Sequence, residues 1–303
     1  MPKPQPIESN YTCNITPIIT KELMLAKISL SAIAATLAIA NVAHANPTGT
    51  IVSDPIFFNP TTDEATLQSL GAASQTFGNT TIYIGTNQVS ANNQDPILTS
   101  FTNGVRDWLI TDYDTSAADA RGLGLLWDGG SSLYAAFTID GGTPPGEGFT
   151  QFTQDGWLSS YGSGGGAKAT VLLQIDAATG VGIGGTYVSA ELSNGNTNTL
   201  LPTGLAFDDD GNVVLDALSF FFPRDIDGST QEQTEFSNSP FPYTIVFDPT
   251  LENALSAVSP GFNGVPLSSD PDPVVQTPEP ATTIMSLFAL GIVTVIKRKK
   301  SRA

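Results

Sequence analysis

The sequence predicts an all-β domain, and three observations support this fold class. Between Asn46 and Val275 the apolar residues show no helical period. Short runs of β-branched and aromatic residues recur there instead. Clusters of Gly, Asn, Asp and Pro separate these runs, as turn residues separate antiparallel strands.

The runs define the expected elements one by one. A short helical segment is expected at 67–73, where no β-branched run occurs. The predicted strands cover 51–58, 80–85, 107–113, 133–139, 169–175, 186–192, 213–222 and 243–247.

A weak repeat relates two of these regions. Residues 124–137 align without gaps with residues 204–217, and both contain Gly, an apolar strand with an aromatic, an Asp/Gly turn and a second apolar strand. This pattern is typical of a hairpin. Gly104 and Gly184 fall at the same offset, and segment 170–180 resembles a propeller strand with its D-x-x-T-G turn. The repeat therefore favours a β-propeller-like fold, with a β-sandwich as the alternative.

The charge is strongly negative. The chain has 303 residues and a formal net charge of -17, and between Asn46 and Pro280 there are 27 acidic residues against four basic ones. Such a field repels phosphate backbones, so no nucleic-acid partner is expected. A solvated surface outside the cell and a surface that collects divalent cations both fit this charge.

Cysteine and histidine usage excludes several kinds of chemistry. The single Cys is Cys13 and the single His is His44, and both precede the predicted mature domain at 46–264. A disulfide, a Ser-His-Asp triad, a cysteine nucleophile and a Cys/His zinc site are therefore excluded from that domain. Core burial must hold it together, and we expect no enzymatic activity.

Residues 24–45 form a predicted signal peptide. Lys27 supplies the positive start, an apolar stretch follows, and Ala43-His44-Ala45 supplies the small residues that precede cleavage before Asn46. Signal peptidase is thus an expected partner. Met24 is a natural start, which would make 1–23 a spurious extension.

The C-terminus carries a second ordered set of features. Pro278-Glu279-Pro280 precedes an apolar run at 281–296, which would span ~24 Å as a helix against the ~30 Å membrane core. A basic cluster then ends the chain, and the positive-inside rule keeps it cytoplasmic, with the domain on the other side. The cluster consists of Lys297, Arg298, Lys299, Lys300 and Arg302.

This tail resembles the PEP-CTERM sorting domain of Gram-negative bacteria and cyanobacteria in its triad, its helix and its basic end. The resemblance covers about the last 27 residues. It implies processing near the triad by an exosortase, a membrane cysteine peptidase, and a final place at the cell surface or in a matrix containing extracellular polysaccharide. A permanent membrane anchor is the alternative. Segment 265–277, rich in Pro and Asp, is expected to be an extended linker before the triad.

Two kinds of site are conceivable in the central domain. Asp208, Asp210 and Asn212 alternate as calcium ligands do, although Val213 and Ser219 depart from the EF-hand pattern and a plain β-turn explains the segment as well. A secreted carbohydrate-active enzyme or lectin could instead use carboxylates and aromatics. Its candidates are Asp112, Asp114, Asp128, Asp155, Trp108, Tyr113, Trp127 and Trp157. The expected role is that of a non-enzymatic surface or matrix protein, with these two, the lectin or enzyme and a calcium-stabilised adhesin, as alternatives.

Overall fold

The described part of the chain consists almost entirely of antiparallel strands. The structure, a computed structural model, describes residues 48–114, 116–141, 148–164 and 166–267, all within the unit Ala45–Ala303. The predicted signal peptide, the sorting tail and the linker beyond Leu267 lie outside the described residues. The prediction of an all-β domain is confirmed for the part that is described.

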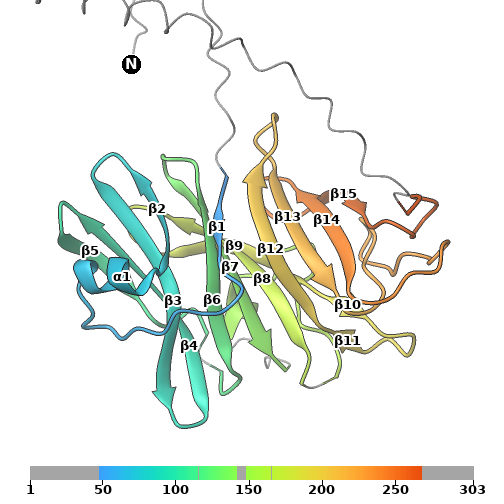
Figure 1. The fold of residues 1–303 in the computed structure, drawn as a ribbon, viewed down its shortest axis with the longest axis horizontal. Coiled ribbons are helices and arrows are strands. Elements are labelled where there is room, and N and C mark those ends of the chain that lie inside the picture. Colours follow the sequence, from blue (N-terminus) through green and yellow to red (C-terminus); the bar gives the residue numbers. More distant parts are fainter. Residues whose placement is uncertain (1–47, 115, 142–147, 165, 268–303) are drawn as a thin grey trace, which may run out of the picture. The chain divides into compact units, whose positions relative to one another are not determined.

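Three larger sheets and one small ribbon make up this part (Figure 1). The central sheet has the order β1 (Thr50–Ile51), β6 (Ala120–Trp127), β7 (Ser132–Asp140), β8 (Lys168–Asp176), β9 (Gly182–Val188). The N-terminal sheet contains β2 (Ala73–Phe77), β3 (Thr80–Ser90), β4 (Asn93–Thr102) and β5 (Val105–Ile110). The C-terminal sheet contains β12 (Leu200–Phe207), β13 (Val213–Ser219), β14 (Phe241–Phe247) and β15 (Ala254–Val258). The ribbon pairs β10 (Ala190–Glu191) with β11 (Thr197–Asn198).

The central sheet is buried on both faces. Alternate residues of β7, such as Ala135 and Phe137, belong to the core shared with the N-terminal sheet. The residues between them, Tyr134 and Ala136, belong to the core shared with the C-terminal sheet. Because side chains alternate across a strand, a strand covered on both faces is apolar at most of its positions. This explains why β7 lacks the polar/apolar alternation of an exposed strand.

The propeller prediction is wrong. The described sheets pack face to face in layers, with the central sheet between the other two, instead of radiating around an axis (Figure 1). Hairpin sequences of this kind fix local strand pairing, whereas the side-chain pattern on both faces of β6 to β8 determines how the sheets stack.

The predicted repeat is confirmed at the level of its hairpins. In β6–β7 Trp127 pairs with Leu133, and in β12–β13 the equivalent Phe207 pairs with Val213. Both ladders also shift register just before the equivalent glycines, Gly124 and Gly204. The proposed extension upstream fails, because Gly104 lies in the turn between β4 and β5 with φ of 81°, whereas Gly184 lies within β9.

The first described segment joins all three larger sheets. Thr50 pairs with Leu125 of the central sheet, and the Gly49 amide donates to the Leu205 carbonyl of the C-terminal sheet at 2.8 Å. The Thr50 hydroxyl donates to the Ser74 carbonyl of the N-terminal sheet at 2.9 Å. A Cβ at Gly49 would lie 2.7 Å from the Leu125 carbonyl oxygen, so this crossing requires glycine. Residues 48–52 are therefore tied by hydrogen bonds into the sheets of the domain.

Most strand predictions hold, with shifts of a few residues at the ends. The predicted strand 51–58 is the main error, because only its first residue belongs to a strand and Pro55 lies beyond it. The predicted helix at 67–73 begins earlier, as α1 (Glu64–Leu70), where the Asp63 carboxylate accepts the Thr66 amide at 2.8 Å as its N-cap. A single 3-10 turn, η1, covers Gly148–Gln151.

The other described segments are connections. Leu267, in the predicted linker, donates its amide to the Glu235 carboxylate at 2.9 Å, so this part of the linker is attached to the domain. Among the described residues, helices are too short or too polar to cross a membrane.

Candidate functional site

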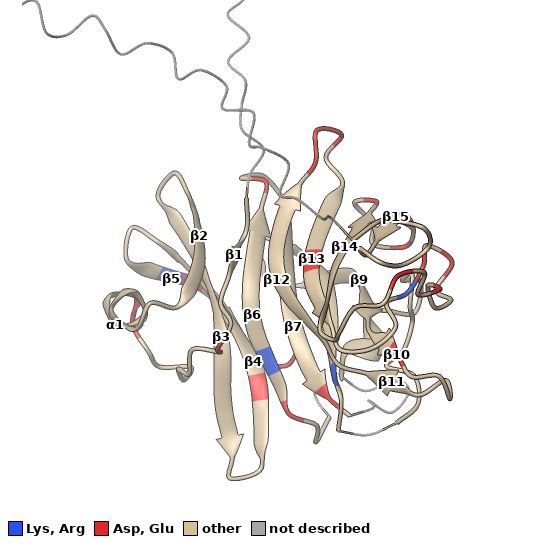
Figure 2. Cartoon of the chain, turned by 45° about the vertical axis from the view of Figure 1, so that its right-hand side comes forward, with Lys and Arg blue, Asp and Glu red and all other residues tan. Residues whose placement is uncertain are grey.

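Acidic residues of the described domain gather in its turns (Figure 2). Four hairpin turns begin with an aspartate that directly follows an aromatic or aliphatic strand residue: Asp128, Asp176, Asp208 and Asp248. Each carboxylate accepts hydrogen bonds from donors of its own turn, for example from the Gly130 amide to Asp128 at 2.7 Å and from the Thr179 amide to Asp176 at 2.9 Å. These four carboxylates therefore act as hydrogen-bond acceptors that stabilise their own turns.

The predicted cation turn follows the same rule. Oδ1 of Asp208 accepts the amides of Asp210 and Asn212 at 2.9 and 2.8 Å, and Oδ2 accepts the Asn212 side-chain amide at 2.9 Å. Chiefly because of the bond from Asn212, the pKa of Asp208 lies below its ordinary value. Asn212 thus directs an N–H, and not an oxygen, at its neighbour.

A cation at this turn would have to displace these bonds. No group of three or more His, Cys, Asp or Glu side chains in the described ranges is arranged to hold a metal ion. Calcium binding by Asp208, Asp210 and Asn212 stays a prediction, and the turn geometry favours the alternative of a plain β-turn.

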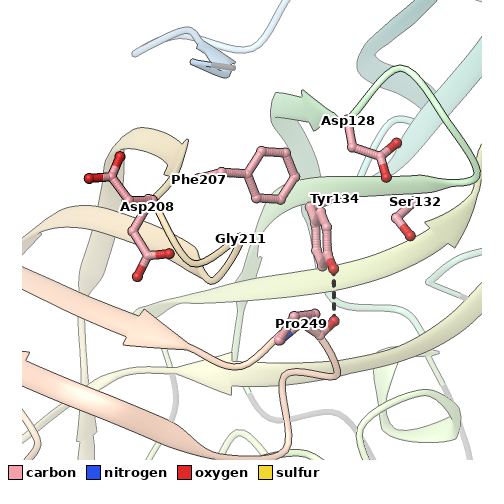
Figure 3. A pocket seen from close by; sticks show the side chains of 8 residues that line it. Asp128, Ser132, Tyr134, Phe207, Asp208, Gly211 and Pro249 are labelled. Carbon is pink, nitrogen blue, oxygen red and sulfur yellow. Dashed lines mark hydrogen bonds between the residues drawn. The ribbon is translucent and has the colours of Figure 1, made fainter. Parts of the chain in front are cut away.

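One pocket lies between this turn and the equivalent turn of the β6–β7 hairpin. It has a volume of about 390 Å³ and is bordered by Asp128 of the β6–β7 turn, Asp208 of the β12–β13 turn and Pro249 of the β14–β15 turn (Figure 3). Asp128 and Asp208 hold equivalent positions in the two repeated hairpins, so the repeat places a carboxylate on each side of the pocket.

The floor of this pocket is aromatic. The rings of Tyr134 and Phe207 meet edge to face at 5.7 Å, and the Tyr134 hydroxyl donates to the Pro249 carbonyl at 2.8 Å (Figure 3). Burial, followed by the charges of Asp128 and Asp248, raises the pKa of Tyr134 to about 12. The Tyr134 hydroxyl therefore stays neutral at physiological pH, and the ring forms a fixed part of the pocket floor.

The structure does not bring the candidate sugar-hydrolysing carboxylates together. Asp128 borders the pocket of Figure 3, Asp112 borders a second cavity and Asp155 a third. Asp114 is 1% exposed and accepts the Ser116 amide. A pair of carboxylates on either side of one glycosidic bond, as hydrolysis requires, is not formed by these four residues.

Two of the four aromatic candidates pack in the protein interior, and two line a cavity. Tyr113 is 1% exposed and packs against Phe137, and Trp157 packs against Phe247. Trp108 and Trp127, in contrast, line one cavity between the N-terminal and central sheets.

Sequence reasoning missed the electrostatic interaction of buried Asp114 with a second, half-buried carboxylate, Asp95 of β4. Burial, and next the charge of Asp114, raises the pKa of Asp95 to about 6, and burial also raises the pKa of Asp114. The spacing of the two residues in the sequence gives no sign of this electrostatic interaction, which depends on how the segment after β5 returns towards β4.

No protein-family model matches the chain, and no curated protein shows significant similarity to it.

Proposed function

We propose that the chain is an exported, non-enzymatic protein of the cell surface or extracellular matrix. The observation that carries this proposal is the order of features at the two ends. A signal-peptide pattern ends at Ala45, and the triad Pro278-Glu279-Pro280, an apolar run and a basic cluster close the chain. The resemblance of the tail to the PEP-CTERM domain adds an exosortase-type peptidase as the expected processing partner.

The described domain supports a role in interaction or scaffolding. Its turn carboxylates accept hydrogen bonds within the turns, and the candidate catalytic carboxylates Asp112, Asp128 and Asp155 border separate cavities. As the finer fold class, we propose a sandwich of stacked antiparallel sheets. Its acidic surface would keep such a protein soluble outside the cell.

The test is the intact mass, with both terminal peptides, of the protein recovered from cells that produce it. The proposal predicts a chain that begins at Asn46 and ends near Pro280. Recovery of a chain that retains residues 284–303 would contradict processing and would indicate a permanent anchor.

A matched pair of variants sharpens this test. Glu279→Ala alters the triad and is expected to leave the tail attached. Asp272→Ala alters the similar Pro271-Asp272-Pro273 sequence seven residues earlier and is expected to leave processing unchanged. Equal processing of both variants would show that the triad is not needed for removal of the tail.

A second candidate is the carbohydrate alternative, in its lectin form. The observation that favours it is the presence of Trp108 and Trp127 in one cavity. The third candidate, a calcium-stabilised adhesin, predicts a higher melting temperature in calcium than in chelator.

A further inference from the structure

A groove opens where the N-terminal and central sheets end together. It has a volume of about 330 Å³, within the range of small-molecule sites. We call it the aromatic groove and define it by Thr80, Ser100, Thr102, Asp107, Trp108 and Trp127. The first five come from β3, β4 and β5, and Trp127 comes from the end of β6, so two sheets contribute to it.

The two tryptophans offer ring surface to a ligand. The Trp108 indole N–H donates to the Ala177 carbonyl at 3.0 Å, and the Trp127 indole N–H donates to the Gly130 carbonyl at 2.9 Å. Because both polar atoms are already bonded within the protein, the rings are held in place and present apolar faces or edges. Phe77, which is 60% exposed, meets Trp127 edge to face at 5.9 Å and extends this surface.

A row of oxygen atoms forms the other wall. The Asp107 Oδ2 atom accepts the hydroxyls of Thr102 and Ser100 at 2.7 and 3.1 Å. The hydroxyls of Thr80 and Thr102 are 2.8 Å apart. Within the described residues Oδ1 of Asp107 receives no hydrogen bond, so this exposed residue keeps an acceptor for a ligand hydroxyl.

The charge of the groove excludes one class of ligand. None of its described lining residues is basic. The nearest arginine in the sequence, Arg106, is used elsewhere, because its guanidinium lies over the Phe101 ring and donates to the Pro60 carbonyl at 2.6 Å. A carboxylate without a neighbouring cation repels anionic ligands.

We propose that the aromatic groove binds a neutral glycan chain. The apolar ring surfaces match the C–H faces of a sugar ring, and Asp107 with the neighbouring hydroxyls matches its O–H groups. This proposal deepens the interaction role proposed above and rests on that role. Binding is measured on purified protein, so failure of binding and failure of tail processing can be told apart.

The tryptophan content of the chain supplies a direct readout. The sequence contains three tryptophans, and two of them line the groove. In a Trp157→Phe background all tryptophan emission therefore comes from the groove. The full chain, purified in mild detergent, would be titrated with the neutral hexasaccharides cellohexaose, maltohexaose and laminarihexaose.

The proposal predicts a saturable change of emission with at least one of these probes. Asp107→Asn is expected to weaken the binding by about ten-fold, as loss of a charged hydrogen bond does. Asp216→Asn is the matched control, because Asp216 is also a strand aspartate that accepts a threonine hydroxyl, from Thr244 at 2.6 Å, but it lies in β13. Binding in this control is expected to equal that of the background.

Three results would overturn the proposal. The first is the absence of any response to the three hexasaccharides in a protein with an unchanged circular dichroism spectrum. The second is equal binding in the Asp107→Asn and Asp216→Asn variants. The third is a response to choline or alginate and none to the neutral hexasaccharides. Trp127→Ala, monitored through Trp108, adds a second test of the same wall, with a predicted loss of about ten-fold.

Discussion

The hairpins β6–β7 and β12–β13 share a strand register and the position of a bulge, yet they lie in different surroundings. Ala136 and Asp216 are equivalent residues, paired with the equivalent glycines Gly124 and Gly204. Ala136 is fully buried against the C-terminal sheet, whereas Asp216 is exposed at the outer surface. The same hairpin pattern therefore occurs in a central layer and in an outer layer. The polarity of the residues on one face of the second strand determines in which layer the hairpin lies.

The largest expected effect comes from exchanging these two residues. Ala136→Asp places an unpaired carboxylate between two sheets, and we expect a loss of more than about 4 kcal/mol in the free energy of unfolding. Asp216→Ala should change it by less than about 0.5 kcal/mol. Denaturant unfolding of both variants checks this, and a folded Ala136→Asp protein of normal stability would disprove burial of β7 on both faces.

The next effect concerns Phe137 and its small equivalent, Ala217. The Phe137 ring lies 5.2 Å from that of Phe149 and 5.7 Å from that of Tyr113, so it fills the space between the N-terminal and central sheets. Phe137→Ala should cost about 3–5 kcal/mol through loss of burial and a remaining cavity. Ala217→Phe should cost about 1–3 kcal/mol through overpacking. Small and similar losses in the free energy of unfolding of both variants would mean that the two layers tolerate a change of side-chain volume equally.

A smaller effect is expected at the β12–β13 turn. The lowered pKa of Asp208 means that its ionised form is favoured by folding, so its contribution exists above the unfolded pKa of about 4 and is lost as the pH falls through the folded value. Asp208→Asn should therefore lower the melting temperature at pH 7, and this difference should shrink as the pH falls below about 4.

Asp210→Asn provides the control, because the Asp210 carboxylate accepts no hydrogen bond among the described residues. Thermal unfolding of this variant should match the unmodified chain at both pH values. A difference between Asp208→Asn and the unmodified chain that is as large at pH 3 as at pH 7 would show that the charge of Asp208 is irrelevant to the turn.

The smallest expected effect is that of calcium. Because Asp208 bonds to donors of its own turn, we expect the same melting temperature in calcium and in chelator. A calcium-dependent rise that Asp208→Asn abolishes would restore the cation site and the adhesin alternative.

The sequence predicts the hairpins well because hairpins depend on nearby residues. The Asp and Gly residues of 128–131 and 208–211 define the turns, and the apolar runs beside them define the strands. It does not predict the stacking of sheets, because burial on both faces of β7 depends on partners more than 50 residues away, such as Ile82 and Ile245. The propeller prediction extended a local pattern to a global arrangement that this pattern does not determine.

For the candidate sites too, features that depend on nearby residues could be predicted, and features that depend on sheet packing could not. The acceptor role of Asp208 follows from its own turn and could be predicted, since Asp-x-x-Gly segments commonly form such turns. The presence of Trp108 and Trp127 in one cavity could not be predicted, because they lie on strands of different sheets whose alignment depends on core packing. Of the eight carbohydrate candidates, sequence reasoning gave no reason to prefer these two.

Amide hydrogen exchange of the two hairpins tests the layered arrangement most directly. Amides of β7, covered on both faces, should exchange at the rate of global unfolding, and those of β13 should exchange at least about ten-fold faster through opening of the C-terminal sheet. Equal rates, or slower exchange in β13, would contradict the placement of β6–β7 at the centre of the stack.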